Sequence, residues 1–183
     1  MQLTGSAEAS GDVQAALVAR ASSGDRDAFA LLIDPRADQL LRTARAILRS
    51  EAEAHDATQQ TLIAAWVHLP SLRDPHRFDA WLQRTLVNEC RQQLRRRSRA
   101  RELELNASAA RNRNGSEGSI ETMAVRNAFS RLSVEQRHIL TVHHLHGVPL
   151  AELADQLGIA VGTAKSRLFR ARQALERALE SEA

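Results

Sequence analysis

Six side chains near the C-terminus have the types and spacing of a helix that contacts nucleic acid. They are Thr163, Lys165, Ser166, Arg167, Phe169 and Arg170. Arginine and lysine donate hydrogen bonds to guanine edges, serine and threonine bond bases or phosphates, and an apolar ring contacts the thymine methyl group. Apolar residues recur at helical spacing on the other face: Ala164, Leu168, Ala171 and Leu175. The pattern predicts a helix that enters the major groove, and the alternative is an ordinary solvated helix face.

The segment before this helix has the form of the first half of a helix-turn-helix. Its apolar positions, Leu150, Leu153, Ala154 and Leu157, fall on one helical face. Gly158 then follows, where a left-handed residue would end the helix. Upstream, Ser133 and Gln136 have the spacing of a capping box that begins another helix. Together these signals predict two short helices joined by a tight turn.

Positive charge is concentrated in the middle of the chain. Residues 81–101 contain seven arginines and one acidic residue, although the net charge of the whole chain is only +3. Such a run suits salt-dependent binding to a phosphate backbone, and the alternative is a solvated helix end. Lys165 is the only lysine. The preference for arginine fits phosphate recognition and fits a GC-rich genome equally well.

No arrangement of residues predicts catalysis or a bound metal. The single cysteine, Cys90, excludes an internal disulfide and a cysteine-based zinc site. Four histidines lie close together, at positions 138, 143, 144 and 146. They lack a neighbouring cysteine or suitably spaced carboxylates, so we do not assign them a metal. The chain also lacks a glycine-rich phosphate loop and a Ser-His-Asp arrangement. We expect no enzyme activity, cofactor or small-molecule substrate.

The N-terminus lacks the pattern of a secretion signal, in which basic residues precede an apolar stretch. No apolar run approaches the roughly 18 residues needed to span a bilayer. We therefore expect a cytoplasmic protein without membrane insertion.

The first hundred residues have the periodicity of helices. Low aromatic content (3%) and the absence of tyrosine disfavour a β-rich fold. Apolar residues predict one helix from about Val13 to Ile33, where Asp34-Pro35 should interrupt it, and a second over residues 40–48. A third is expected over 52–69, then a loop over 70–75. A long helix follows from about Arg77, with Trp81 in the core. We expect residues 1–11 to be disordered.

The expected architecture is all-α, with two small helical domains joined by a flexible linker. Residues 12–101 form a four-helix domain in this interpretation. Residues 102–121 are rich in Asn, Ser, Ala and Gly and lack periodicity, which is typical of a linker. Residues 122–183 form the helix-turn-helix domain.

Two stretches together resemble one known family. VGTAKSRLFRARQAL, preceded by RLSVEQRHILTVHHLHGVPLAELADQLGI, is similar to the promoter-binding domain of the extracytoplasmic-function (ECF) RNA polymerase sigma factors. In the first domain, AEAHDATQQTLIAAW resembles the polymerase-binding helix of that family. FDAWLQRTLVNECRQQLRRRSR resembles its reader of the downstream promoter element. The resemblance covers about residues 25–101 and 122–180, and the linker falls where the family has one.

The resemblance implies a role for each matching residue. Asp56, Gln59 and Gln60 would contact the clamp helices of the polymerase β′ subunit, although His55 replaces the acidic residue usual before the aspartate. Phe78 and Asn88 match positions that hold a flipped base of the −10 element, while a core position is equally compatible with Phe78. The neighbouring arginines would follow the −10 backbone: Arg91, Arg95, Arg96, Arg97 and Arg99.

In the second domain, Lys165, Ser166, Phe169 and Arg170 match positions that face the −35 element, and Thr163 and Arg167 lie nearby for phosphate contacts. The implied function is a sigma factor that directs core RNA polymerase to promoters and traps melted bases. Its implied partners are the β′ clamp helices and β flap of the polymerase, promoter DNA and an anti-sigma factor. Two other interpretations remain. One is a simple helix-turn-helix regulator of duplex DNA, and the other is an adaptor that presents sigma-like surfaces to another protein.

Overall fold

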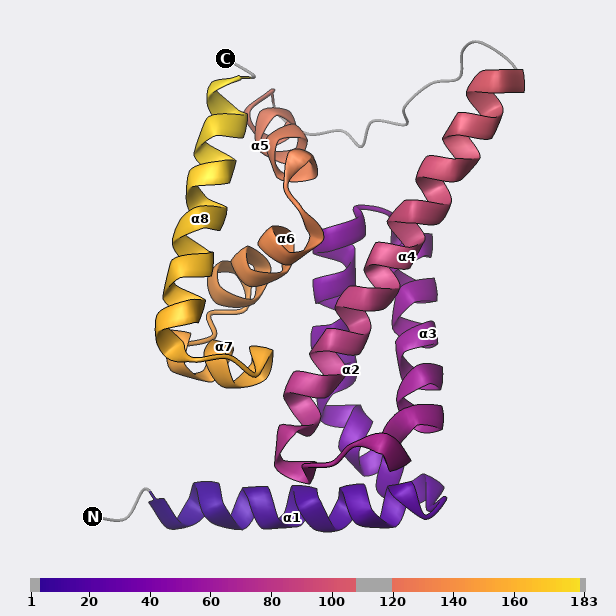
Figure 1. The fold of residues 1–183 in the computed structure, drawn as a ribbon, viewed down its shortest axis with the longest axis vertical. Coiled ribbons are helices and arrows are strands. Elements are labelled where there is room, and N and C mark those ends of the chain that lie inside the picture. Colours follow the sequence, from indigo (N-terminus) through magenta and orange to yellow (C-terminus); the bar gives the residue numbers. More distant parts are fainter. Residues whose placement is uncertain (1–3, 108–119, 182–183) are drawn as a thin grey trace.

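A computed structural model describes residues 4–107 and 120–181 (Figure 1). These residues form eight α-helices and no strand, which confirms the all-α prediction. The first four helices are α1 (Thr4–Ser22), α2 (Arg26–Leu48), α3 (Glu51–His68) and α4 (Phe78–Ala107). The other four are α5 (Ile120–Arg131), α6 (Val134–Leu140), α7 (Leu150–Leu157) and α8 (Val161–Glu180).

The first helix break lies at Gly24, and Pro35 does not interrupt α2. Gly24 has a φ of +94°, which glycine adopts without steric penalty. Asp25 then caps α2, because its carboxylate accepts a 3.0 Å hydrogen bond from the Ala28 amide. The prediction of a break at Asp34-Pro35 was therefore wrong. The carbonyl that loses its partner to Pro35 belongs to Leu31, on the exposed face of α2, where water can replace the missing bond.

Helix α1 begins at Thr4, so the disorder expected for residues 1–11 is wrong from residue 4 onward. Residues 1–3 lie outside the described part of the chain. The helix crosses one end of the α2–α4 bundle (Figure 1), where the Gln14 amide donates to the Pro75 carbonyl. Arg36 joins the same region, since its guanidinium pairs with Asp79 at the start of α4.

A continuous apolar core holds α1 to α4 together. Its fully buried large side chains include Leu32, Leu40, Ile47, Leu48, Leu69, Phe78, Leu82 and Leu86. Trp81 packs against this core, as predicted. Between α3 and α4, where the sequence predicted a loop, the chain forms two short 3-10 helices, η1 (Leu69–Ser71) and η2 (Pro75–Arg77).

Helix α4 extends further than the sequence pattern indicated. It continues to Ala107, and α5 begins at Ile120. Residues 102–107 and 120–121, predicted as linker, are therefore helical. Residues 108–119, the rest of that prediction, lie outside the described residues. Hydrophobic periodicity did not predict this extension because an arginine-rich helix that continues beyond the core has no apolar stripe.

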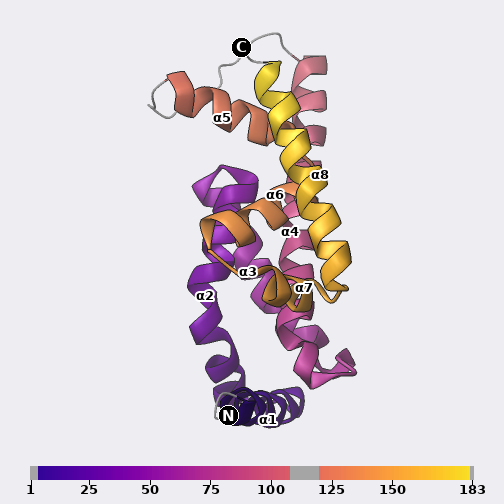
Figure 2. The same cartoon turned by 90° about the vertical axis from the view of Figure 1, so that its left-hand side faces the viewer.

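A second core joins α5 to α8. Leu132, Ile139, Leu140, Val142, Val148, Leu153, Leu168 and Ala171 are its buried members. The predicted capping box is present, because the Ser133 hydroxyl accepts from the Gln136 amide and the Gln136 side chain accepts from the Ser133 amide. A single π-helical turn, η3 (Thr141–Leu145), follows α6. The two cores lie side by side, with α6 and α7 against α2 and α4 (Figures 1 and 2).

Candidate nucleic-acid interface

Helix α8 has one buried face and one exposed face. Ala164, Leu168 and Ala171 are buried against the second core. All six residues predicted to contact DNA are exposed: Thr163, Lys165, Ser166, Arg167, Phe169 and Arg170. The Phe169 ring is 59% exposed, which is unusual for a large apolar side chain. The helix therefore presents hydroxyl, ammonium, guanidinium and aromatic groups together on one surface.

The turn before α8 fixes the direction of this surface. Gly158 ends α7 with a φ of +64°, in the left-handed conformation that the sequence predicted. Its amide donates to the Asp155 carbonyl at 2.8 Å, and the Ile159 amide donates to the Ala154 carbonyl at 2.9 Å. Leu153 is fully buried and holds α7 in the core. Helix α8 thus begins shortly after a tight hydrogen-bonded turn, as in a helix-turn-helix.

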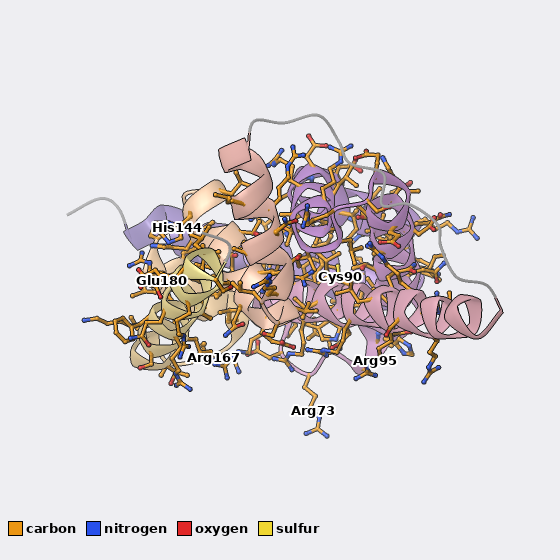
Figure 3. The ribbon with its side chains drawn as sticks, turned by 90° about the horizontal axis from the view of Figure 1, so that it is seen from above. Arg73, Cys90, Arg95, His144, Arg167 and Glu180 are labelled. Carbon is orange, nitrogen blue, oxygen red and sulfur yellow. The ribbon has the colours of Figure 1, made fainter. Side chains whose placement is uncertain are left out.

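A second cationic surface lies on α4. Asn88 is exposed and Arg91 is half-buried, and the Arg91 guanidinium donates to the Asn88 Oδ1 at 2.8 Å. That bond occupies the acceptor of the amide and leaves its NH2 donors available for another group. Four further arginines on α4 are exposed: Arg95, Arg96, Arg97 and Arg99. Arg95 projects from the helix in Figure 3. Apart from Arg97, which lies 3.6 Å from Glu53, these side chains are suited to a phosphate backbone.

Phe78 is not part of this surface, so its predicted contact with a flipped base is corrected. Its side chain has no exposed area. The Trp81 ring lies 6.0 Å away, between ring centroids, and the Arg36 guanidinium lies 5.4 Å from the centroid of the Phe78 ring. A base can stack only on an accessible ring. The core interpretation of Phe78 is the one that the structure supports.

The predicted polymerase-binding residues form one exposed face of α3. Asp56, Gln59 and Gln60 are all exposed. Two apolar residues extend the same face, and the sequence analysis missed both: Ile63 is 49% exposed and Val67 is 59% exposed. Spacings of three and four residues place them on the Gln60 side of the helix. The helical spacing of these two branched apolar residues from Gln60 was the signal in the sequence that could have identified them.

The four clustered histidines have protein partners. His138 bonds Gln83, His143 bonds the Val148 carbonyl, and His144 accepts a bond from Arg172. His146 lies 3.4 Å from the Thr43 hydroxyl. Within residues 4–107 and 120–181, no group of three or more metal-ligating side chains converges.

Burial lowers the pKa of His138 from 6.5 to about 4, with a further lowering by His146 and an opposing effect of Glu135. Unfolding restores the ordinary pKa, so the unfolded chain binds more protons between these two values. The free energy of unfolding should therefore be greatest above pH 6.5 and fall as the pH drops toward 4. Urea titrations at about pH 7 and about pH 5 measure this difference. A His138→Gln variant should lose less stability over that interval, and an unchanged slope would contradict the assignment.

None of the described helices is both long and apolar enough to cross a membrane.

Comparison with known proteins agrees with this geometry. Residues 32–100 match the family model of sigma-70 region 2, and residues 122–175 match that of sigma-70 region 4. The ECF RNA polymerase sigma factor SigM of Mycobacterium tuberculosis is 36% identical over 167 residues, which is 90% of this chain and 84% of SigM. The chain belongs to the ECF sigma factors. The sigma factor CnrH of Cupriavidus metallidurans is 29% identical over 93% of this chain and 96% of its own length.

Two solved structures share the fold of this sigma factor. CnrH in complex with the cytosolic domain of CnrY has a TM-score of 0.62 at 29% identity, over 93% of this chain and 99% of CnrH. RpoE of Bartonella quintana, in complex with the anti-sigma factor NepR, has a TM-score of 0.53 at 27% identity. That match covers 80% of this chain and 93% of RpoE.

Sigma factors bind core RNA polymerase and promoter DNA, and they direct promoter-specific initiation of transcription. They are regulators of transcription and not catalysts. The cationic surfaces of α4 and α8 belong to the two regions that the family models match.

Proposed function

We propose that this sigma factor reads the −35 element with α8, reads the −10 element with α4, and holds core polymerase through α3. The observation that carries the proposal is the face of α8, where six donor and apolar groups are exposed while the opposite face anchors the helix. A helix presented this way fits the major groove, which is about 12 Å wide.

On α8, Lys165, Ser166, Phe169 and Arg170 are proposed to contact base edges. Arg170 supplies a planar guanidinium that can bond guanine O6 and N7 together, and Phe169 offers a ring for a thymine methyl group. Thr163 and Arg167 are proposed to bond phosphates and fix the register of the helix.

On α4, Asn88 is proposed to bond an unpaired base of the −10 element. Its free NH2 group would select a base edge that carries an acceptor. Arg91 and the exposed arginines after it would bind the backbone at positions 95, 96, 97 and 99. Trapping bases outside the duplex returns part of the free energy of unstacking. In this proposal melting is driven by binding, without ATP hydrolysis.

On α3, Asp56, Gln59 and Gln60 are proposed to meet the β′ clamp helices, and Ile63 and Val67 to add an apolar centre. Interfaces commonly combine a desolvated apolar centre with a polar rim. The second domain is proposed to contact the β flap. The solved relatives CnrH and RpoE are bound to CnrY and to the anti-sigma factor NepR. An anti-sigma partner is therefore also proposed for this chain.

An Ile63→Asp substitution should weaken binding to core polymerase by roughly tenfold or more, because it places a charge in the apolar centre of the interface. Ile63 is half exposed, so the fold should be retained. Titration of fluorescent sigma factor with purified core polymerase measures the dissociation constant. Val13→Asp on α1, where the residue is 60% exposed, is the matched control and should bind like the wild type. Equal affinity of both variants would exclude this face of α3.

The promoter specificity can be tested with genomic DNA. Core polymerase reconstituted with the chain should select a set of fragments that share two short elements at a fixed spacing. Core polymerase alone is the control and should select none. Fragments retained by the chain without polymerase, and unchanged by its addition, would instead indicate a simple helix-turn-helix regulator.

A further inference from the structure

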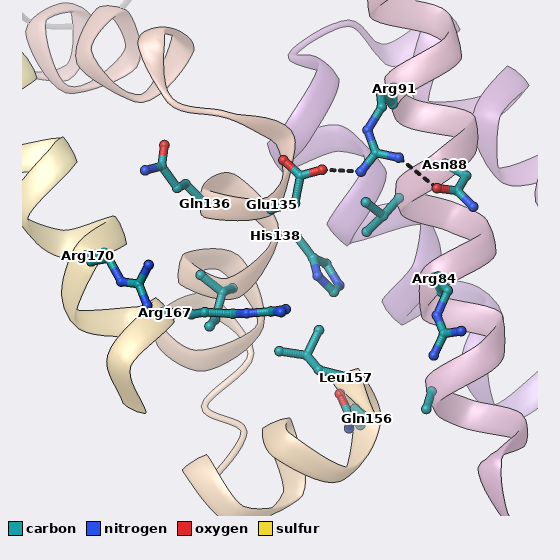
Figure 4. A pocket seen from close by; sticks show the side chains of 13 residues that line it. Arg84, Asn88, Arg91, Glu135, Gln136, His138, Gln156, Leu157, Arg167 and Arg170 are labelled. Carbon is teal, nitrogen blue, oxygen red and sulfur yellow. Dashed lines mark hydrogen bonds and ion pairs between the residues drawn. The ribbon is translucent and has the colours of Figure 1, made fainter. Parts of the chain in front are cut away.

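A cleft of about 420 Å³ lies where α4 faces α6, α7 and α8 (Figure 4). Small-molecule sites in proteins commonly have volumes of roughly 300–1,000 Å³, so a cleft of this size can hold one such ligand. Its lining combines apolar side chains with arginines from α4 and α8. The roles proposed above for these two helices make no use of the apolar part.

Four side chains form the apolar part of the lining. Ala80 and Val87 come from α4, Ile139 from α6 and Leu157 from α7. The first three are buried and Leu157 is half-buried. His138 lies beside them, and it is neutral at ordinary pH because burial lowers its pKa to about 4. A flat apolar group that packs here is removed from water.

The same cleft contains more positive than negative charge. Four arginines line it, and Glu135 is the one acidic residue among its described lining side chains. Arg91 pairs with Glu135, so that carboxylate is already used. Within residues 4–107 and 120–181, no ion pair neutralises Arg84, Arg167 or Arg170. Like charges that share a cleft repel, and an anion bound between them relieves the repulsion.

The three unpaired guanidiniums come from both sides of the cleft. Arg84 projects from α4 and Arg167 from α8, with Arg170 further along α8 (Figure 4). A guanidinium donates paired hydrogen bonds to two phosphate oxygens, and its plane also stacks on aromatic rings. Three such groups match a ligand that carries several phosphates better than one that carries a single carboxylate.

Gln156 adds a directional polar group beside the apolar lining. Its amide nitrogen donates to the Glu152 carboxylate at 3.1 Å. Its oxygen is buried and has no hydrogen-bond partner among the described residues, which is unfavourable. Because the side chain as a whole is only half-buried, a rotation can direct this oxygen to an amino group of a ligand in the cleft.

We infer that the cleft binds a purine nucleotide with two or three phosphates. The phosphates lie on Arg84, Arg167 and Arg170, and the base packs on the apolar lining with its amino group toward Gln156. Arg167 and Arg170 also have roles in the proposed function, but nucleotide binding depends on the cleft alone and not on those roles. The sigma factor thereby gains a small-molecule ligand in addition to polymerase and DNA.

Isothermal titration calorimetry of the whole chain with ATP, and separately with GTP, tests the inference. Mg²⁺ is omitted because it would neutralise the phosphates. Each nucleotide that binds should do so once per chain. Adenosine, which lacks the phosphates, should bind roughly a hundredfold more weakly than ATP. Tripolyphosphate, which lacks the base, should bind roughly tenfold more weakly, and this difference separates the cleft from a general attraction of anions to the arginines of α4.

An Arg84→Gln substitution should weaken nucleotide binding by roughly tenfold or more, because it removes a charged donor from the cleft. Arg84 is exposed, so the fold should be retained. Arg73→Gln is the matched control, since Arg73 projects from the surface outside the cleft and its replacement removes the same charge (Figure 3). This variant should bind nucleotide like the wild type. Circular dichroism checks that both variants remain folded.

Photolabelling locates the base in the chain. ATP that carries a photoreactive azide on its adenine ring should label the tryptic peptides 85–91 and 138–165, which contain Val87, Ile139 and Leu157. Mass spectrometry identifies the labelled peptides, and an excess of unmodified ATP should suppress the label.

Failure of both ATP and GTP to bind would overturn the inference. Equal affinities for ATP and tripolyphosphate, equal affinities of Arg84→Gln and Arg73→Gln for ATP, or a label confined to other peptides would also overturn it. None of these measurements requires the chain to direct transcription, so failure of the nucleotide site and failure of the proposed function are distinguishable.

Discussion

Replacing both Lys165 and Arg170 with alanine should reduce promoter-specific transcription at least about thirtyfold. Each hydrogen-bonded side chain at a base edge contributes roughly 1–3 kcal/mol of discrimination, so removing two of them should weaken recognition by about 2 kcal/mol or more. Both side chains are exposed on α8, which predicts little effect on folding. Competition between the selected promoter and a scrambled −35 element, measured with reconstituted polymerase, gives the change in specificity.

The matched control removes the same charge from the same helix. Arg172 and Arg177 are exposed on α8 beyond the proposed base-reading turn, and their double alanine variant should keep the promoter preference. If both double variants lost promoter preference equally, α8 would bind DNA only through its general positive charge and would not read bases. No loss in either, with polymerase binding intact, would favour an adaptor that does not read DNA through α8.

The second large effect is on stability. A Phe78→Ala substitution should lower the free energy of unfolding by about 3–5 kcal/mol, because it empties a fully buried site between Trp81 and Arg36. Whole domains are commonly stable by only about 5–15 kcal/mol. Urea denaturation followed by circular dichroism measures the change.

Phe169→Ala provides the comparison, since that ring is 59% exposed and its loss should change stability by less than about 0.5 kcal/mol. The two aromatic residues should thus have opposite phenotypes, with stability affected at position 78 and promoter recognition at position 169. A Phe78→Ala chain of normal stability that fails only in promoter melting would restore the base-pocket interpretation.

Periodicity and capping patterns predicted the elements that carry the two surfaces. The third helix was expected over residues 52–69 and runs from Glu51 to His68. The capping box at Ser133 and the left-handed Gly158 were correct because both depend on local hydrogen bonding and backbone conformation. The exposure of the six α8 residues was predictable because the apolar residues between them, such as Ala164 and Leu168, mark the opposite face of the helix as buried.

The predictions for Pro35 and Phe78 failed because tertiary packing, which the local sequence does not indicate, determined their positions. Pro35 lies inside α2 because apolar residues on both sides of it, including Leu32 and Leu40, are buried in one core. An aromatic residue at the start of a helix is compatible with a surface site or a core site, and packing with Trp81 and Arg36 placed Phe78 in the core.

The contact between domains had no local signal. Gln83 and His138 are 55 residues apart, and nothing in the neighbourhood of either residue indicates its partner. The clustered histidines had no assigned role in the sequence, and in the structure His138 and His146 contact Gln83 and Thr43 of the first domain. Single polar pairs across a boundary produce no periodicity, so only the folded arrangement reveals them.

Transcription from a defined template tests the central claim most directly. Purified core polymerase, the chain and a linear fragment carrying a selected promoter are combined, and run-off products are separated by length. We predict one product of the expected length that requires both the chain and an intact promoter. A chain that binds core polymerase but yields no promoter-dependent product would contradict its assignment as an initiation factor.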